Sequence, residues 1–282
     1  MKWLITGGAG MVAADLRNEL QARGEEVIAP NRAELDVTDA TAVQHFIAEH
    51  RPHAIINCAA FTKVDLAEEQ EAIANAINGS AVEFLAHAAN DVDALLMQIS
   101  TDFVFDGSKT TPYEVNDATN PLSAYGRTKL LGEQAATQAR KHVIVRTSWL
   151  FGVNGPNFVE AMRGQIRKGT NPLRVVSDQR GRPTYTPHLA SAILRLAQHE
   201  NARGVFHYAD ESECSWFDFA RAIVEEVRAR VDVAPVTTAE FPRPAKRPAY
   251  SVLSTERYER VTGVRPESWR DGLREYLALR HD

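Results

Sequence analysis

Short apolar segments alternate with longer amphipathic stretches through the first half of this 282-residue chain. The apolar segments are rich in large or β-branched residues and are too short to be helices, so we predict that they are strands. These candidate strands are segments 3–5, 27–29, 54–56, 94–99 and 143–145. Helical spacing is found between them, in stretches 11–23, 40–50, 68–89 and 123–140. Such alternation predicts a parallel sheet covered by helices on both faces, which is the doubly wound α/β fold.

The regular alternation weakens after about residue 152. Helical patterns occur at 157–168, 187–198, 215–231, 254–261 and 268–279, whereas segment 235–248 holds four of the thirteen prolines and predicts a loop. We therefore predict two domains, which are a dinucleotide-binding, Rossmann-like domain at 1–152 and a smaller α/β domain at 153–282. The second domain is expected to be mainly substrate-binding, with a return of the chain to the first sheet around 173–207.

Composition excludes several classes of protein. The chain is 44% apolar and 24% charged with a net charge of −5, which indicates a globular protein without a nucleic-acid-binding surface. Only two cysteines occur, Cys58 and Cys214, which fits a reducing compartment and excludes a disulfide framework. No secretory leader and no apolar run long enough to span a membrane is evident. We expect a soluble cytoplasmic protein that binds neither membranes nor nucleic acid.

A glycine turn follows the first candidate strand directly and opens the first candidate helix. In this turn Gly7 allows the tight bend, Gly10 lets a pyrophosphate approach the backbone, and Ala13 permits close packing of helix on strand. The free N–H groups of the helix N-terminus attract an anion. The turn therefore predicts a dinucleotide site, the alternative being a tight turn without a ligand.

The ends of the second and third candidate strands supply further cofactor candidates. No acidic residue precedes Glu34 after the second strand, and Arg32 there can pair with a 2′-phosphate, which favours NADPH or tolerance of both cofactors. The alternative is a solvated arginine. Asp36 can accept from an adenine amine, and the small Ala59 and Ala60 let a cofactor lie close to the backbone. Helix capping and core packing are the alternatives for these segments.

Three polar residues predict the chemistry. Tyr125 and Lys129 lie four residues apart on one face of a candidate helix, and Thr101 ends the fourth candidate strand. We expect the ammonium to stabilise the phenolate and so to make the phenol proton easier to transfer. The Thr101 hydroxyl can hold a substrate oxygen beside the phenol, which polarises a carbonyl for hydride attack. The alternative is an ordinary helix pair on the surface.

The glycine turn and the Tyr125-x-x-x-Lys129 pair resemble the extended short-chain dehydrogenase/reductase superfamily. Closer resemblance is to the dTDP-4-dehydrorhamnose reductase family, and it runs through essentially the whole chain. The segments that carry it are Ser100-Thr101-Asp102-Phe103-Val104-Phe105-Asp106-Gly107, Arg146-Thr147-Ser148-Trp149, Asp178-Gln179-x-Gly181-x-Pro183-Thr184 and Arg247-Pro248-x-x-Ser251-x-Leu253.

This resemblance implies reduction, by NADPH or also NADH, of the 4-keto group of a nucleotide-linked 4-keto-6-deoxy sugar. Tyr125 would donate the proton, Lys129 would lower the Tyr125 pKa and bind the nicotinamide ribose, and Thr101 would orient the keto oxygen. The implied substrate-binding residues are Thr101, Asp102, Phe103 and Trp149. The implied cofactor-binding residues are Gly7, Gly10, Met11, Val12, Asn31, Arg32, Asp36, Val37, Ala59, Ala60, Phe61, Thr62, Ser100, Tyr125 and Lys129.

Two features depart from the family. Phe103 stands where tyrosine is common, so a hydroxyl is missing beside the substrate, which leaves the sugar and the product stereochemistry open. Some relatives hold a divalent metal between subunits near the position of Asp15, but we expect an exposed, solvated aspartate and predict no metal. A homodimer is compatible with the sequence but is not determined by it.

Other functions remain open at this point. A nucleotide-sugar dehydratase would need Asp-Glu after the threonine, whereas Phe103 follows Asp102 here. A 4-epimerase would be expected to have the acidic residue that the second strand lacks. A non-catalytic NADP-binding subunit, like the regulatory subunit of methionine adenosyltransferase, shares the family resemblance. The complete set of Thr101, Tyr125 and Lys129 favours the reductase.

Overall fold

A six-stranded parallel sheet forms the centre of the larger lobe. The computed structural model describes residues 1–280, and in it the strand order is β10-β5-β4-β3-β1-β2. The bounds are β1 Lys2–Thr6, β2 Glu26–Ile28, β3 Ala54–Asn57, β4 Leu95–Thr101, β5 His142–Thr147 and β10 Gly204–His207. The predicted doubly wound α/β fold is confirmed, and all five predicted strands occur within two residues of their expected bounds.

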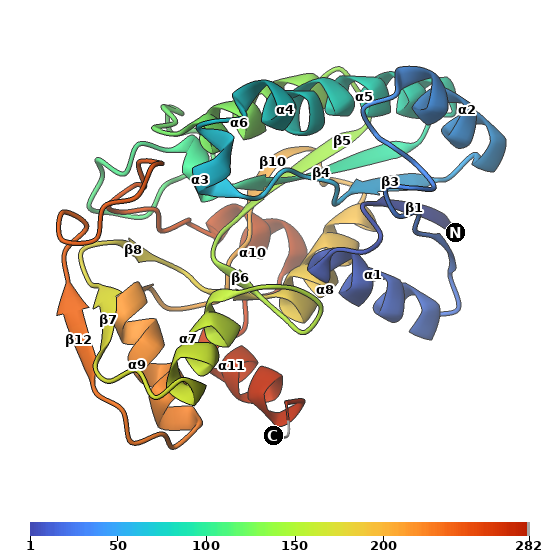
Figure 1. Ribbon diagram of the computed structural model, residues 1–282. Coiled ribbons are helices and arrows are strands. Elements are labelled where there is room, and N and C mark those ends of the chain that lie inside the picture. The colour runs from blue at the N-terminus through green and yellow to red at the C-terminus, as the bar shows by residue number, and fades with distance from the viewer. Residues whose placement is uncertain (281–282) are drawn as a thin grey trace.

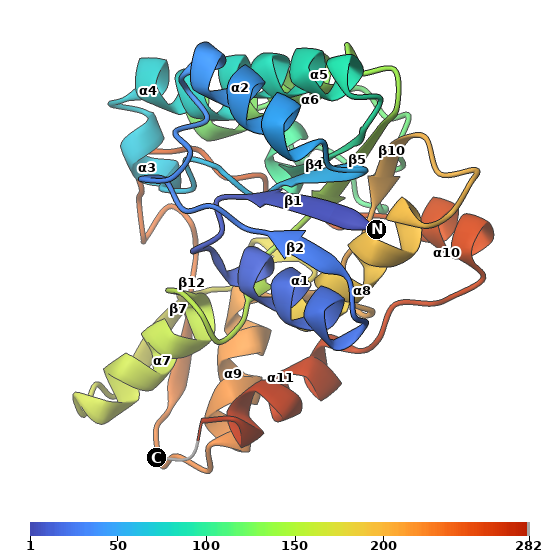
Figure 2. The ribbon, with the colours of Figure 1, turned by 90° about the vertical axis from the view of Figure 1, so that its right-hand side faces the viewer.

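Helices cover both faces of this sheet, as Figures 1 and 2 show. One face carries α1 (Met11–Ala22) and α8 (Thr186–Ala197), and the other carries α2 (Ala40–His50), α5 (Ala81–Asp91) and α6 (Ala124–Ala136). Each layer has its own apolar core: Trp3, Leu16 and Ile193 are buried on the first face, and Leu4, Ile47 and Leu85 on the second. Successive residues of β1 thus point to opposite faces, as a strand buried on both sides requires.

The smaller lobe is built around aromatic residues below this sheet. It contains α7 (Phe158–Arg167), α9 (Trp216–Glu226), α11 (Trp269–Ala278) and the parallel pair of β7 (Leu173–Val176) with β12 (Val233–Val236). Two pairs of two-residue strands add to it: β6 (Leu150–Phe151) pairs with β9 (Thr184–Tyr185), and β8 (Arg180–Gly181) with β11 (Cys214–Ser215). Among residues 1–280 no helix has the length and apolar character needed to cross a bilayer.

The chain returns to the large sheet after it has entered the smaller lobe. Helix α8 packs on α1, and β10 extends the sheet beside β5. Helix α10 (Glu256–Thr262) then lies beside β10. By contrast β7, which also falls between residues 173 and 207, pairs only with β12 in the smaller lobe. The lobes are therefore interleaved in sequence.

Two predicted elements differ from the structure. Stretch 68–89 is not one helix: α3 (Val64–Ala67) precedes it, and α4 (Glu71–Asn75) and a π-helical turn (Ala76–Ser80) precede α5. The π turn brings Asn78 to the backbone of Phe61, with which it exchanges hydrogen bonds of 2.8 and 3.1 Å. Pro235 lies in β12 rather than in a loop, which is tolerated because β12 has a partner on one side only.

Asp15 is half-buried rather than exposed. It lies on α1 beside the Thr186 hydroxyl at the start of α8, and burial raises the pKa of its carboxyl. The packing of α8 on α1 covers it, a contact that the sequence of α1 alone does not reveal.

Candidate active site

The glycine turn lies tightly against the ends of two neighbouring strands. Gly7 has φ of +65°, and a Cβ there would be 2.8 Å from the Ala59 backbone after β3. A Cβ on Gly8 would be 2.2 Å from the carbonyl oxygen of Ala29 after β2, a constraint that the sequence analysis missed. Gly10 caps α1 without a side-chain hydrogen bond, and the first turn contains no acidic residue. The N–H groups of Met11 and Val12 therefore lie unpaired within the helix, at the positive end of the helix dipole.

We use the name cofactor groove for the surface formed by the glycine turn, the loop after β2 and the chain after β3, which lie against one another. The loop after β2 forms its rim. The Arg32 side chain is 81% exposed, and its nearest carboxylate oxygen is Asp36 Oδ2 at 3.7 Å. Asp36 accepts from the Thr38 backbone and hydroxyl at 3.0 and 2.7 Å, which lowers its pKa. Asn31 caps the same loop by accepting from Ala33 N at 2.8 Å. The Arg32 guanidinium is thus largely exposed and could leave Asp36 to pair with a phosphate.

The chain after β3 continues the groove. Ala59, Ala60 and Phe61 are partly exposed and Thr62 is exposed, whereas Val37 on the preceding loop is buried. Asn78 fixes the Phe61 backbone. Burial raises the pKa of the Cys58 thiol to about 12, so this residue remains a neutral part of the wall.

At the end of β4 the polar residues point in different directions. Thr101 Oγ1 donates to Asp102 Oδ1 at 3.0 Å and accepts from Phe103 N at 3.2 Å. Burial raises the pKa of Asp102 to about 6, against the opposing effect of the Ser251 and Thr101 hydroxyls. The Ser100 hydroxyl donates to Glu133 Oε1 at 2.5 Å. Only the backbone of Ser100 is therefore left to face a cofactor.

Tyr125 lies in the first turn of α6, where Ser123 caps the helix by accepting from Gly126 N. Its ring packs edge-on against Phe103, with 5.5 Å between centroids. Burial raises the Tyr125 pKa to about 12, while the nearby Thr101 side chain opposes this shift. The structure thus places Thr101, Phe103 and Tyr125 together.

Lys129 follows one turn later and is buried. Its Nζ donates to the carbonyl oxygen of Ile99 at 2.6 Å, and burial lowers its pKa to about 8, partly offset by the Glu133 charge. Our expectation that the ammonium would acidify the Tyr125 phenol is wrong for this structure. Burial of the phenol dominates, and Lys129 is directed at β4 instead. The phenol consequently keeps its proton at neutral pH.

A buried ion pair that the sequence analysis missed holds α6 on the sheet. Arg146 of β5 binds both carboxylate oxygens of Glu133, at 2.8 and 2.7 Å, and both side chains are 5% exposed. Glu133 lies four residues after Lys129, a spacing that could have signalled its proximity. The pair joins α6 to β5, which is hydrogen-bonded to the strand that carries Thr101 and Ile99.

Trp149 lies where the chain passes from β5 into the smaller lobe. Its ring stacks on Trp216, with 3.6 Å between centroids and 9° between planes, and a Cβ at Gly181 would lie 2.6 Å from it. Trp216 begins α9 and was not predicted. The two rings form one aromatic wall, although they are far apart in the sequence.

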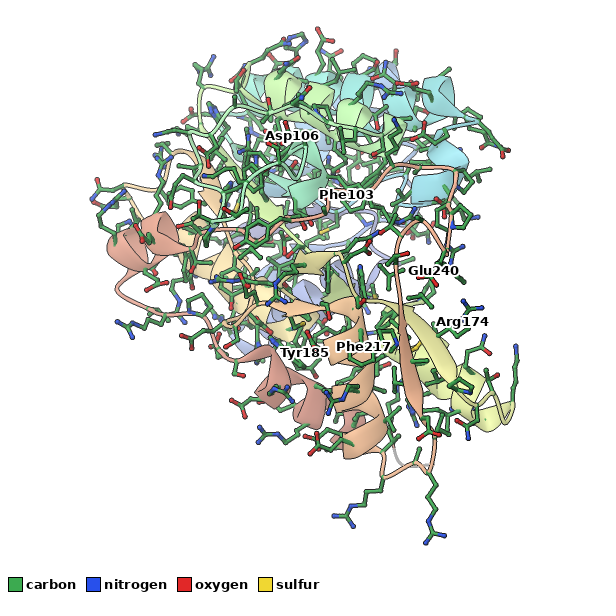
Figure 3. The ribbon with its side chains drawn as sticks, turned by 90° about the vertical axis from the view of Figure 1, so that its left-hand side faces the viewer. Phe103, Asp106, Arg174, Tyr185, Phe217 and Glu240 are labelled. Atoms are coloured by element: carbon green, nitrogen blue, oxygen red, sulfur yellow. The ribbon has the colours of Figure 1, made fainter. Side chains whose placement is uncertain are left out.

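A cavity of about 850 Å³ extends from this wall through the smaller lobe. Leu122, just before α6, lines it, and Trp216 and Phe158 provide apolar surface. Arg174, Arg243 and Lys246 lie around it, and none of the three has an ion pair within the described chain. Figure 3 shows Phe103 in the larger lobe, with Arg174 and Glu240 in the smaller lobe below it. Among residues 1–280 no acidic side chain lines the cavity, so it suits an anion with an aromatic part.

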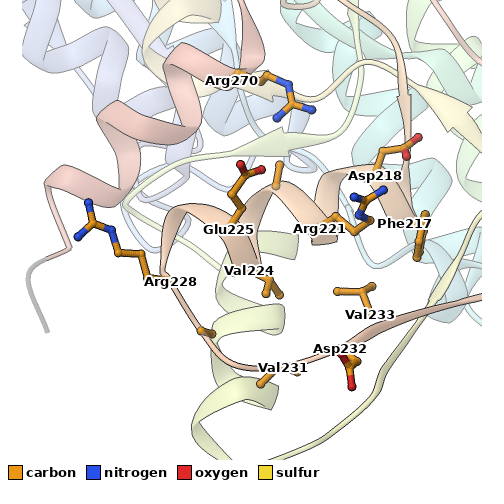
Figure 4. A pocket seen from close by; sticks show the side chains of 12 residues that line it. Phe217, Asp218, Arg221, Val224, Glu225, Arg228, Val231, Asp232, Val233 and Arg270 are labelled. Carbon is orange, nitrogen blue, oxygen red and sulfur yellow. The ribbon is translucent and has the colours of Figure 1, made fainter.

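A second cavity, of about 830 Å³, lies against α9 (Figure 4). Its arginines, Arg221, Arg228 and Arg270, alternate with acidic side chains. One of these, Asp218, is already bound to Ser215 as part of the cap of α9. With balanced charge and no catalytic group, this cavity gives no reason to assign a ligand.

Comparison with known proteins places this geometry in a family. The model of the RmlD substrate binding domain matches residues 1–281. The spore coat polysaccharide biosynthesis protein SpsK of Bacillus subtilis is 40% identical over 280 residues, which cover 99% of this chain and 98% of SpsK. A dTDP-4-dehydrorhamnose reductase of Mycolicibacterium smegmatis is 42% identical over 280 residues, covering 98% and 84%.

Solved structures agree with these sequence comparisons. The crystal structure of a dTDP-4-dehydrorhamnose reductase from Clostridium acetobutylicum superposes with a TM-score of 0.96 at 44% identity, over 99% of both chains. The protein of that name from Bacillus anthracis, solved in complex with NADP, gives 0.94 at 37% identity, over 99% of this chain and 100% of that chain. The resemblance seen in the sequence motifs is confirmed, and the chain belongs to the RmlD substrate binding domain family, whose members include these reductases.

Proposed function

We propose that this protein uses NADPH to reduce the 4-keto group of a nucleotide-linked 4-keto-6-deoxy sugar, converting dTDP-4-dehydrorhamnose to dTDP-rhamnose. The observation that carries the proposal is the meeting of Thr101 and Tyr125 at the carboxyl edge of the sheet, with Lys129 one turn behind. Relatives that share about 40% identity over almost the whole chain are named for this reduction. Ligands of open α/β sheets bind at this edge.

The chain supplies a proton and an oriented carbonyl. NADPH, when bound, provides the hydride that reaches the sugar C4. Tyr125 holds its proton at neutral pH and donates it to the keto oxygen, which becomes the 4-hydroxyl. The Thr101 hydroxyl, now donated to Asp102, can turn to the keto oxygen and hold it beside the phenol. Lys129 lies one turn after Tyr125 on α6, and its ammonium, now bound to the Ile99 carbonyl, would bind the nicotinamide ribose.

The cofactor groove fits NADP. The positive helix end at Gly10 takes the pyrophosphate, and Arg32, whose nearest acidic partner is 3.7 Å away, takes the 2′-phosphate. The roles proposed for Asn31, Asp36 and the segment from Ala59 to Thr62 follow from their positions along this groove. The Bacillus anthracis relative was solved with NADP.

The cavity of the smaller lobe fits the nucleotide part of the substrate. Its three cations without ion pairs, Arg174, Arg243 and Lys246, suit a diphosphate, and Trp216 offers a flat face to a base or sugar. Trp149 then supports Trp216 by stacking on its ring. A cytoplasmic location and a homodimer also belong to this proposal, and light scattering of the purified protein tests the dimer.

The proposal is tested by mixing the purified protein with NADPH and dTDP-4-dehydrorhamnose. Loss of the nicotinamide absorbance at 340 nm, with one dTDP-rhamnose formed per NADPH, supports the reductase. Tight binding of NADP without turnover would instead support a non-catalytic subunit. Interconversion of 4-hydroxyl epimers of a nucleotide sugar, without net loss of NADPH, would support an epimerase.

A further inference from the structure

The segment that closes the substrate cavity is held at its first end within the smaller lobe. We call residues 238–247 the strap; it leaves β12 and crosses towards α3 (Figure 1). At its start, Thr238 donates to both carboxylate oxygens of Asp178 at 2.9 Å and accepts from Gln179 at 2.9 Å. From there the strap carries Arg243 and Lys246 past the cavity.

The other end of the strap is held by the larger lobe. Arg247 binds Asp65 of α3 through two parallel hydrogen bonds, each of 3.0 Å, and Ala245 N donates to the same carboxylate at 3.3 Å. The side chains of Arg247 and Asp65 are only 22% and 32% exposed. Burial raises the Asp65 pKa, but hydrogen bonds from Arg247 and Ala245 and the charges of Arg247 and Arg243 bring it below its usual value. The carboxylate is therefore charged across the neutral range.

Helix α3 also contacts the proton donor and the cofactor groove. Glu68, which ends α3, accepts from Ala124 N at 2.8 Å and so caps the helix that carries Tyr125. Ala67 of α3 packs with Ala124, and Phe61 and Tyr125 pack against this pair. Asp65 thus sits on a short element that touches the cofactor groove on one side and the catalytic helix on another.

We propose that Asp65 is a positioning residue. It holds the strap over the substrate cavity at a fixed position relative to α6, the helix that carries Tyr125. The inference rests on the proposed function, because it takes the cavity to be the nucleotide-sugar site. Its physical basis is that a bidentate Arg–carboxylate pair fixes both distance and orientation, whereas the strap between Thr238 and Ala245 has few other anchors. Without Asp65, Arg243 and Lys246 lose their fixed place relative to Tyr125.

The experiment compares Asp65→Asn with wild type in two assays. Calorimetry measures the affinity for dTDP and for NADP⁺, and steady-state kinetics measure KM and kcat for dTDP-4-dehydrorhamnose. Loss of charge-assisted hydrogen bonds at the strap should weaken dTDP binding and raise KM about tenfold, while kcat falls no more than about threefold. NADP⁺ affinity should stay within about twofold of wild type, because the groove residues are unchanged.

A matched control removes a similar ion pair from the same lobe. Glu71 of α4 binds Arg127 through two hydrogen bonds of 2.8 Å, but it does not touch the strap. Glu71→Gln should leave dTDP affinity at the wild-type value. Asp65→Glu should recover most of the lost affinity, and Arg247→Lys, which keeps the charge but loses the paired geometry, should show an intermediate rise in KM.

The outcomes separate this inference from the proposed function. Equal dTDP affinity and KM in Asp65→Asn and wild type would overturn the positioning role, even if the protein is the proposed reductase. An equal loss in Glu71→Gln would overturn it too, because general loosening of α6 would explain both. A wild-type protein that binds dTDP but does not reduce the sugar would refute the proposed function, while weaker dTDP binding in Asp65→Asn would still support the positioning role. If Asp65→Asn does not fold, Arg247→Lys decides in its place.

Discussion

The cofactor groove and the substrate cavity are built in different ways. The groove is made of turns that directly follow β1, β2, β3 and β4, and its shape depends on backbone contacts such as those of Gly7 and Gly8. The cavity is assembled from α7, β7, the start of α9 and the strap, which are distant in sequence. The position of the groove residues is set by one edge of the sheet, whereas the position of the cavity residues depends on contacts between separate segments.

This difference separates the chemistry from substrate choice. Proton donation and cofactor binding depend on turns at one edge of the sheet and on α6, where small displacements are resisted by buried contacts such as the pair of Arg146 with Glu133. The cavity residues can change without disturbing that edge. We therefore expect changes at the groove to alter the rate, and changes at the cavity to alter KM.

Replacing the proton donor should give the largest effect. Tyr125→Phe removes the hydroxyl but keeps the ring against Phe103, so kcat should fall about 1000-fold while NADPH affinity changes less than about twofold. Stopped-flow absorbance measures the rate, and fluorescence titration measures the NADPH affinity. A variant that retains more than a tenth of the wild-type kcat would refute Tyr125 as the donor.

The charge on Lys129 should limit activity at high pH. Its pKa of about 8 means that the ammonium is present below this pH and is lost above it. We expect kcat/KM to be level below about pH 7, to be halved at the pKa and to approach a tenfold fall per pH unit above it. The measurement is a pH profile in buffers of constant ionic strength. A profile that stays flat to pH 10 would show that this charge is not needed.

Removing the aromatic wall should affect binding more than rate. Trp216→Ala opens the cavity and leaves Trp149 unsupported, so KM for the nucleotide sugar should rise about tenfold, with kcat within about threefold. Trp149→Ala should also act mainly on KM. Phe217→Ala is a matched control, because Phe217 lines the second cavity and should leave KM unchanged.

The smallest effect is expected at the rim of the groove. Arg32→Ala should weaken NADPH binding about fivefold and leave NADH binding unchanged, because only NADPH carries the 2′-phosphate. The ratio of the two KM values measures this selectivity. An equal loss of affinity for both cofactors would show that Arg32 does not bind the 2′-phosphate.

The two regions also differ in how far the sequence reveals them. Gly7, Thr101, Tyr125 and Lys129 could be singled out because each lies in a local strand–turn–helix pattern with known spacing. Trp216 and the contact between Arg247 and Asp65 could not, because they depend on how segments more than 60 residues apart pack together. Local patterns carry no information about such contacts.

Other sequence predictions placed residues correctly but were wrong about their pKa values or hydrogen bonds. The sequence placed an ammonium near a phenol but could not show that burial would dominate the Tyr125 pKa, or that Lys129 Nζ would bind the Ile99 carbonyl. It also gave no sign that Gly8 is pressed against Ala29, because that contact depends on the path of β2. The π turn at Ala76–Ser80 was missed because helical periodicity continues through it.

The most direct test of the account follows the hydride itself. The protein is incubated with dTDP-4-dehydrorhamnose and NADPH carrying deuterium at C4 of the nicotinamide, on whichever face the enzyme uses, and the product is examined by NMR. The account predicts deuterium at C4 of the sugar, in a single configuration, and a solvent proton on the new hydroxyl. Deuterium that stays on the nicotinamide, or that appears at another sugar carbon, would contradict it.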